Sequence, residues 1–167
     1  QADIHDLIPQ LEVGNHLDAD CLLGARFMRN SRLKGYSWFR TFGNRVYNSL
    51  FSLVAKRSIY DLGSGLNLYR METFQEFYLK KFPDDLTFNY VMLLASYHRK
   101  QKVRFFPISW REEEQRSNVK LFTQAFKVLW LLTNYAFKRI RFLNSELRTR
   151  SFENYTGQIR YRNNENN

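Results

Sequence analysis

Three segments of the chain carry apolar residues every three or four positions, which is the spacing of an amphipathic helix. They are residues 1–13, 39–54 and 121–142. Two shorter segments with the same period, 71–81 and 86–99, predict further helices. Acidic residues stand just before the second of these, where they favour the start of a helix.

Strand-like segments alternate with these helices. The apolar run at 20–25 predicts a buried strand, residues 59–70 predict extended structure around a Gly-Ser-Gly turn, and residues 103–110 predict another strand. Pro107 places that last strand at a sheet edge or a bulge, because proline cannot donate to the ladder. Residues 27–38 predict a basic loop. The alternation of strands and helices favours an α/β layer architecture.

Composition narrows the class of protein. The chain has 167 residues, enough for one domain with a substantial core, and its 44% of apolar residues excludes a wholly disordered chain. No apolar run approaches the ~20 residues that a membrane-spanning helix needs. The single cysteine, Cys21, excludes an intrachain disulfide and favours a reducing compartment. Because it lies in an apolar run, we expect a buried thiol rather than a nucleophile.

Charge is distributed unevenly. The formal net charge is +10, and 15 of the 26 Lys and Arg residues follow residue 98, against 6 of the 16 Asp and Glu residues. This asymmetry points to an anionic partner, which could be a phosphate, a nucleic acid or an acidic membrane surface. The helix at 121–142 mixes basic residues with bulky apolar ones, among them Phe122, Phe126, Leu129, Trp130 and Tyr135. It could lie among the headgroups of anionic lipid, or it could pack on the protein or on a part of the protein that this sequence lacks.

A cluster of arginines and asparagines forms the first candidate site. Arg26 ends the 20–25 strand, and the helix at 39–54 carries Arg40, Asn44 and Arg45. Guanidinium groups fork onto phosphate oxygens, and amides fill the remaining acceptor positions. The end of a strand in an α/β sheet is also where ligands bind. The alternative is a solvated basic face.

Two further motifs contain aspartates. A buried Asp61 could orient one of the arginines, while the turn around Ser64 and Gly65 could aim backbone N–H groups at a phosphate. An ordinary turn with a self-capping Asp is the alternative. Asp84 and Asp85 could supply a general base, or they could simply cap the helix that follows.

The charged loop at 110–120 is the last candidate site. Its basic residues, Arg111, Arg116 and Lys120, could close over a charged ligand. A solvated run of charges is the alternative.

In their order along the chain, these motifs resemble the second half of a family-2 glycosyltransferase with the GT-A fold. The likeness is closest to the dolichol-phosphate-mannose-synthase-like branch. The motifs that carry it are Gly24-Ala25-Arg26, RTFGNRVYN at 40–48, DLGSGLNLYR at 61–70 and FPISWREEEQRS at 106–117. The resemblance implies a partial, Rossmann-like GT-A domain at 1–120 that lacks its N-terminal nucleotide-binding half. An amphipathic, membrane-associated helix at 121–143 and a polar, unstructured tail at 144–167 would follow.

The resemblance also implies roles for residues. Gln1 would sit beside a divalent cation, Mg²⁺ or Mn²⁺, whose other ligands would lie mostly upstream. The phosphate-binding arginines of the family would fall on Arg26 and Arg40, with Asn44 and Arg45 nearby. The aspartate of the D-x-x-SG segment would be Asp61. Since the nucleotide-binding half is missing, we expect this fragment to be inactive alone.

The enzyme implied by the resemblance transfers a sugar from a nucleotide-diphosphate sugar to a polyprenyl phosphate or a glycan at the cytoplasmic face of a membrane. A polyprenyl phosphate is largely ionised near neutral pH, because its second pKa is about 6, so it needs arginines more than a base. A sugar hydroxyl needs a base, for which Asp85 is the candidate. We favour the phosphate acceptor. The alternatives are a basic nucleic-acid-binding module, which is less favoured, and a non-catalytic membrane-surface module.

Overall fold

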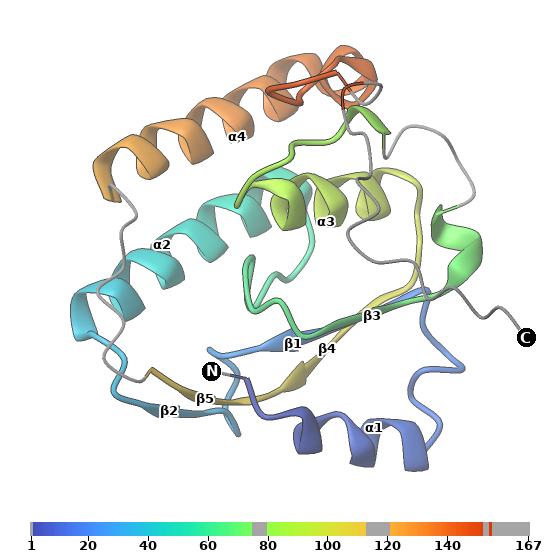
Figure 1. The fold of residues 1–167 in the computed structure, drawn as a ribbon, viewed down its shortest axis with the longest axis vertical. Coiled ribbons are helices and arrows are strands. Elements are labelled where there is room, and N and C mark those ends of the chain that lie inside the picture. The colour runs from blue at the N-terminus through green and yellow to red at the C-terminus, as the bar shows by residue number, and fades with distance from the viewer. Residues whose placement is uncertain (1, 75–79, 113–120, 152–153, 155–167) are drawn as a thin grey trace, which may run out of the picture.

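A computed structural model describes residues 2–74, 80–112, 121–151 and 154 of the chain (Figure 1). Its elements, in chain order, are η1 (Ile4–Asp6), α1 (Ile8–Glu12), β1 (Cys21–Ala25), β2 (Arg32–Lys34), α2 (Trp38–Ala55), β3 (Asn67–Tyr69), η2 (Met71–Phe74), α3 (Phe88–His98), β4 (Val103–Pro107), β5 (Ser109–Arg111) and α4 (Leu121–Asn144). The chain is therefore a mixed α/β protein, as the alternating pattern predicts.

The main sheet is built around β1, which lies between β3 and β4. It runs antiparallel to β3 and parallel to β4, with Cys21 opposite Tyr69 on one side and Val103 on the other. A second, two-stranded sheet pairs β2 with β5 in parallel. In Figure 1, α1 lies on one side of the strands, and α2, α3 and α4 lie on the other. All five residues of β1 are buried, as expected of a strand covered on both faces.

Gly24 allows the chain to pass close to the end of β1. Its N–H donates to the carbonyl of Leu66 at 2.8 Å. A Cβ atom at this position would lie 2.8 Å from that carbonyl oxygen and 2.9 Å from Ile108 Cγ2, both closer than real Cβ contacts allow. The segment that follows the Gly-Ser-Gly turn can therefore approach β1 only because residue 24 has no side chain.

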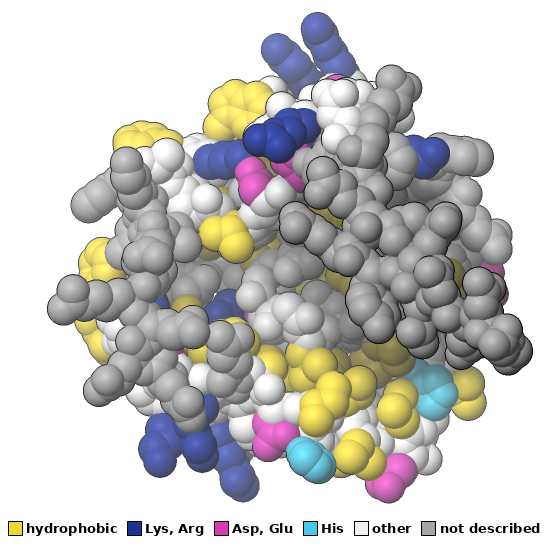
Figure 2. Space-filling view, viewed as in Figure 1, with side chains coloured by type: hydrophobic (Ala, Val, Ile, Leu, Met, Phe, Trp, Pro, Cys, Tyr) yellow, Lys and Arg dark blue, Asp and Glu magenta, His cyan; other side chains and the backbone are white. Residues whose placement is uncertain are grey.

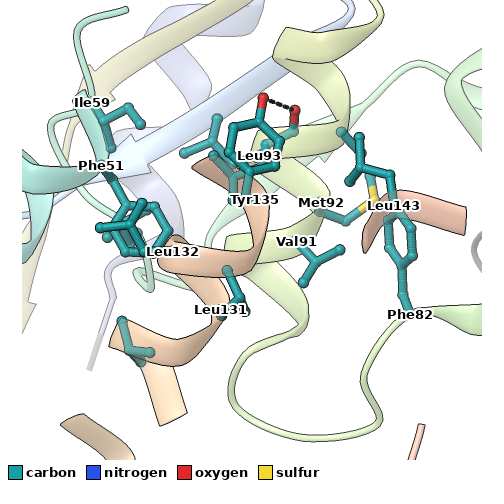
Figure 3. Close-up of a cluster of buried hydrophobic side chains, with 14 of the residues drawn as sticks. Phe51, Ile59, Phe82, Val91, Met92, Leu93, Leu131, Leu132, Tyr135 and Leu143 are labelled. Atoms are coloured by element: carbon teal, nitrogen blue, oxygen red, sulfur yellow. Dashed lines mark hydrogen bonds between the residues drawn. The ribbon is translucent and has the colours of Figure 1, made fainter. Parts of the chain in front are cut away.

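The core lies between the sheet and the helices, and α3 is its central helix (Figure 3). Residues 91–96 of α3 are all buried, as expected of a helix that is apolar almost all round. α4 packs against it through Val128, Leu131 and Tyr135. The Tyr135 hydroxyl donates to the Leu94 carbonyl at 3.3 Å. One face of α4 thus belongs to the core, so the packing that we held as an alternative for this helix is present.

Several predicted elements differ in detail from the structure. The predicted strand at 103–110 divides into β4 and β5 on either side of Ile108, and Pro107 lies in an edge strand of the described sheet, as predicted. The predicted basic loop at 27–38 contains β2, which the sequence does not reveal because its pairing partner is distant. The helix predicted at 71–81 begins as the short η2, and residues 75–79 lie outside the described residues.

The predicted polar tail begins inside the fold. Leu147 packs against the core and its N–H donates to the Lys81 carbonyl at 2.8 Å. Thr149 is bound to Asp84. Most of the predicted tail beyond residue 151 lies outside the described residues.

Candidate functional site

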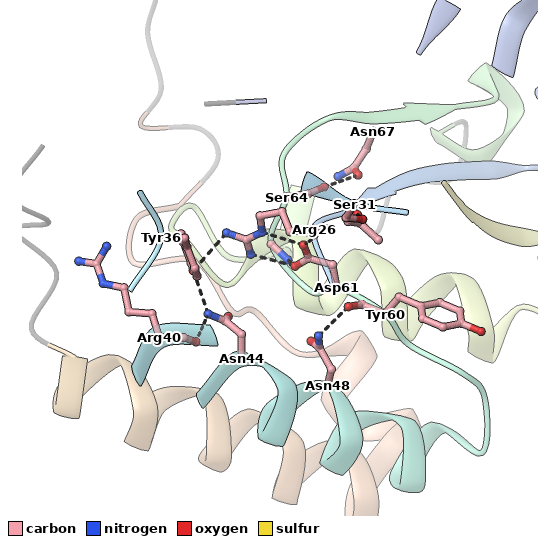
Figure 4. Close-up of polar contacts among 12 residues, drawn as sticks. Arg26, Ser31, Tyr36, Arg40, Asn44, Asn48, Tyr60, Asp61, Ser64 and Asn67 are labelled. Carbon is pink, nitrogen blue, oxygen red and sulfur yellow. Dashed lines mark hydrogen bonds and ion pairs between the residues drawn. The ribbon is translucent and has the colours of Figure 1, made fainter. Parts of the chain in front are cut away.

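Arg26 and Asp61 form a buried, two-point ion pair at the end of β1 (Figure 4). Arg26 Nε lies 2.7 Å from Asp61 Oδ2, and Nη2 lies 2.9 Å from Oδ1. The Arg26 backbone N–H also donates to Oδ2 at 2.9 Å. The two side chains are only 8% and 1% exposed. Asp61 therefore orients an arginine, as the sequence suggests, and it ties its own loop to β1.

Three aromatic rings surround the Arg26 guanidinium. Its central carbon lies 5.1 Å from the centre of the Phe27 ring, 5.5 Å from Tyr36 and 5.0 Å from Trp110. Burial alone would lower the pKa of Arg26, but the contact with Asp61 outweighs it and raises the pKa. The guanidinium is thus always charged, and Asp61 neutralises it. The sequence gives no sign of this aromatic cage beyond its 17% of aromatic residues.

The Tyr36 hydroxyl joins β1 to α2. It accepts hydrogen bonds from Arg26 Nη1 at 3.4 Å and from Asn44 Nδ2 at 3.0 Å. Asn44 Nδ2 also donates to the backbone carbonyl of Arg40, one turn earlier in α2, at 2.8 Å. The hydroxyl oxygen accepts these two bonds, and within the described residues no acceptor is found for its own hydrogen, which can therefore be donated to a ligand. Tyr36 is a candidate ligand contact that the sequence analysis did not identify.

The Arg40 guanidinium forms an ion pair with Glu112, just beyond β5. Both side chains are partly buried, and the Glu112 backbone N–H donates to the Lys34 carbonyl of β2 at 2.9 Å. In the view of Figure 4, the Tyr36 ring lies between the guanidinium groups of Arg40 and Arg26. Asn44 and Tyr36 join the Arg40 backbone to Arg26 by hydrogen bonds, but each arginine has a carboxylate partner. The uncompensated positive cluster that the sequence suggests is absent for this pair.

Other predicted phosphate ligands lie elsewhere or outside the described part. Arg45 is exposed on α2, one residue past Asn44 and on another face of the helix. Arg111 is exposed on β5, and together with the dominant hydrogen bonds from His5 its charge lowers the pKa of Asp3. The predicted ligands Arg116 and Gln1, and Lys120 of the same loop, lie outside the described residues.

The Gly-Ser-Gly turn has a structural role. Ser64 is buried, and its hydroxyl donates to Asn67 Oδ1 at 3.5 Å. The Gly63 N–H donates to Asp61 Oδ1 at 3.0 Å rather than to a ligand. The enclosed cavity beside the turn measures about 10 Å³, which has room for one water molecule at most. The turn therefore fixes Asp61, and the cavity on this side of it is too small for the predicted phosphate.

Asp84 and Asp85 also have structural roles, because each accepts hydrogen bonds from another residue of the chain. Asp84 accepts hydrogen bonds from Thr149 N at 3.0 Å and Thr149 Oγ1 at 2.8 Å. Asp85 accepts from Thr87 N at 2.8 Å and Thr87 Oγ1 at 2.6 Å, just before α3, and it forms an ion pair with Lys127 of α4. Burial alone would raise the pKa of Asp85, but the bonds from Lys127 and Thr87 outweigh it and lower the pKa.

General-base catalysis is most efficient when the pKa of the base lies near the working pH, so the lowered pKa of Asp85 disfavours the role that we predicted for it. Asp85 instead orders the start of α3 and connects it to α4. This role resembles the helix capping that was the alternative to a general base.

The described residues offer no cluster of three or more His, Cys, Asp or Glu side chains that could hold a metal. Asp3 accepts hydrogen bonds from His5, and Asp6 accepts from the backbone and side chain of Ser109. These two carboxylates, which follow the predicted cation ligand Gln1, therefore stabilise the N-terminal segment. Cys21 is buried beside Ser96, and burial raises the pKa of its thiol, as expected of a structural cysteine.

Comparison with protein-family models, with curated proteins and with solved structures gave no match for this chain.

Proposed function

We propose that this chain is the acceptor-side part of an inverting family-2 glycosyltransferase of the GT-A type. The enzyme would transfer a sugar from a nucleotide-diphosphate sugar to a polyprenyl phosphate, as a peripheral protein at the cytoplasmic face of a membrane. The observation that carries the proposal is the hydrogen-bonded connection from Arg26, at the end of β1, through Tyr36 to Asn44 on α2. Arg40 lies one turn from Asn44.

Arg40 and Tyr36 are the groups proposed to hold the acceptor phosphate. The Arg40 guanidinium already binds a carboxylate, and a phosphate can replace a carboxylate in that contact. The Tyr36 hydroxyl has its hydrogen left to donate. Arg26 would position Tyr36 rather than touch the ligand, because Asp61 already fills its fork.

The state of the Asp85 carboxylate supports a phosphate acceptor. A phosphate acceptor is ionised near neutral pH and needs no base to attack the sugar. A hydroxyl acceptor needs one, and Asp85 has a lowered pKa and bonds to Thr87 and Lys127. The site therefore favours a polyprenyl phosphate over a glycan hydroxyl.

The nucleotide-sugar donor and a divalent cation, Mg²⁺ or Mn²⁺, are further proposed partners. A cation of this kind neutralises the charge that grows on a leaving diphosphate. The described residues do not fit a cation site, so no step of the reaction is assigned to it.

The test is sugar transfer by the full-length protein, with labelled nucleotide sugar and with polyprenyl phosphate or polyprenol as acceptor. Arg40→Ala should reduce transfer to polyprenyl phosphate by about 100-fold, as loss of a charge-assisted contact does, while hydrolysis of the donor by water changes little. Equal loss of both activities, or equal use of polyprenol, would contradict the proposal.

Filter binding to single-stranded nucleic acid separates this proposal from the nucleic-acid alternative. Contacts to a phosphate backbone weaken steeply with salt. Tight, salt-dependent binding to nucleic acid in a protein that shows no sugar transfer would favour the alternative.

A further inference from the structure

The helix α2 turns most of its apolar residues outward. Its inward face carries Arg40, Asn44 and Asn48, with Phe51 as the buried apolar contact. Its opposite face is an exposed stripe, named here the α2 stripe, which consists of Trp38, Phe39, Phe42, Val46, Leu50 and Leu53. A surface helix normally turns such a stripe to the core, so an exposed one indicates a partner.

The helix α4, a neighbour of α2, carries a second exposed stripe. Its inward face is the core contact described above. Its outward face before the kink at Lys138, named here the α4 stripe, carries Phe126, Leu129, Trp130 and Phe137, and Ile140 is exposed beyond the kink. In Figure 2, hydrophobic side chains stand at the surface over α4 and on the side where α2 begins, with basic side chains beside those over α4.

Charge distinguishes among the possible partners. Neither α2 nor α4 contains a single Asp or Glu, while together they carry six Lys and Arg residues, at positions 40, 45, 127, 138, 139 and 141. Of these, Arg45, Lys138, Arg139 and Arg141 are exposed next to the stripes. Aromatic and aliphatic residues on helices whose own charged residues are all basic are typical of helices that lie in the headgroup region of anionic lipid.

We propose that the α2 and α4 stripes dock on an anionic lipid bilayer. The reason for such docking rests on the proposed function, in which Arg40 and Asn44 on the inward face of α2 belong to the phosphate site. Docking by the outward face would hold the phosphate site next to the surface in which a polyprenyl phosphate is anchored. None of the helices in the described part of the chain combines the length and the apolar character needed to cross a bilayer.

The test is co-sedimentation of the 167-residue chain with lipid vesicles, without nucleotide sugar or acceptor. Vesicles of phosphatidylcholine are compared with vesicles that contain about 30% phosphatidylglycerol, at about 0.1 and 0.5 M salt. We expect strong binding only to the anionic vesicles, weakened by salt, together with a blue shift of tryptophan emission as Trp38 and Trp130 leave water.

Two matched pairs of substitutions locate the surface. Trp38→Ser with Leu53→Ser removes apolar side chains that are 78% and 75% exposed on the α2 stripe. Val13→Ser with Leu17→Ser removes side chains that are 69% and 70% exposed after α1, on the other side of the strands. The first pair should weaken vesicle binding by at least about tenfold and the second by less than about twofold, since partition scales with the apolar area buried in the lipid.

A third variant tests the second helix. Phe126→Ser with Phe137→Ser should also weaken vesicle binding, because both belong to the α4 stripe. Unchanged circular dichroism shows that each variant is folded.

Equal binding of the α2-stripe variant and the wild type would overturn the inference. So would a stable dimer in solution that the α2-stripe substitutions dissolve while vesicle binding persists, because the stripe would then cover a second copy. The vesicle assay contains no sugar donor or acceptor, so it is independent of the sugar-transfer assay. A protein that binds vesicles but transfers no sugar contradicts only the proposed function. A protein that transfers sugar but does not bind vesicles contradicts only the docking.

Discussion

The carboxylate of Asp61 meets the guanidinium of Arg26 with both oxygens, at 2.7 and 2.9 Å, and a third bond reaches it from the Arg26 backbone. Both charges are buried, so neither can be solvated if its partner is lost. This pair fixes the loop after α2 to the end of β1, and through Arg26 it also orients Tyr36.

Asp61→Asn should therefore destabilise the fold severely. It leaves the Arg26 charge buried without a counter-charge, and breaking such a pair costs about 3–5 kcal/mol in free energy of unfolding. Urea unfolding measures the loss. Asp18→Asn is the control, because Asp18 pairs with Arg104 at the surface, where the loss should stay below about 1 kcal/mol. Similar small losses for both variants would show that the buried pair is dispensable.

Gly24→Ala and Gly43→Ala should change stability in opposite directions. A methyl group at position 24 would collide with the Leu66 carbonyl and Ile108, at a cost of about 1–3 kcal/mol. A methyl group at position 43 meets nothing within 4 Å and lies inside α2, where alanine is favoured over glycine by about 1 kcal/mol. Thermal unfolding measures both. A destabilising Gly43→Ala, or a neutral Gly24→Ala, would be inconsistent with this packing.

The contribution of Asp85 to stability should depend on pH. Its pKa in the folded chain is lower than the ordinary value of 3.8, so the carboxylate stabilises the fold above that value. The stabilisation is lost as the pH falls through the lower, folded pKa. Asp85→Asn should therefore reduce the free energy of unfolding near neutral pH and have a much smaller effect in strong acid, where the native carboxyl also becomes protonated. Denaturant unfolding at several pH values checks this. If the loss of unfolding free energy caused by Asp85→Asn grew as the pH fell, the predicted pH dependence would be wrong.

Sequence spacing predicted α2 almost to the residue, but it did not predict which face is buried. Periodicity marks an apolar face and a polar face, and the usual rule turns the apolar one inward. In α2 the polar face is inward because Asn48 bonds to the Tyr60 carbonyl and Asn44 to Tyr36, so the core side of the helix is a hydrogen-bonded one. Local pattern contains no information about such distant partners.

The candidate site was predicted in part. Asp61 does orient an arginine, because an acid after a helix and an arginine after a strand meet once the sheet forms. The pairing of Arg40 with Glu112 was not foreseen, since Glu112 comes from a charged run that the sequence presents as solvated. Tyr36 and Trp110 were missed for a similar reason, since aromatic residues in a basic loop and at a strand end carry no pattern that assigns them a partner.

Glu112→Gln should strengthen binding of a phosphate acceptor. In the wild type the Glu112 carboxylate competes with the phosphate for Arg40, and the amide competes far less. Farnesyl phosphate, a short polyprenyl phosphate, serves as the acceptor in this measurement. Its dissociation constant, measured by calorimetry, should fall by about threefold to tenfold. Glu146→Gln, which removes the same charge from an exposed position after α4, is the control and should leave the constant unchanged. Weaker binding by Glu112→Gln would mean that Glu112 supports the site rather than competing for it.

The most direct measurement compares Arg40→Ala with Arg45→Ala in binding farnesyl phosphate, with farnesol as the uncharged reference ligand. The two arginines share α2, but the Arg40 backbone carbonyl is joined to Tyr36 through Asn44, whereas Arg45 is exposed on another face. The account predicts that Arg40→Ala weakens binding of the phosphate by at least about tenfold, Arg45→Ala by less than about twofold, and neither changes binding of farnesol. Equal losses for the two variants, or no preference of the wild type for the phosphate over the alcohol, would contradict it.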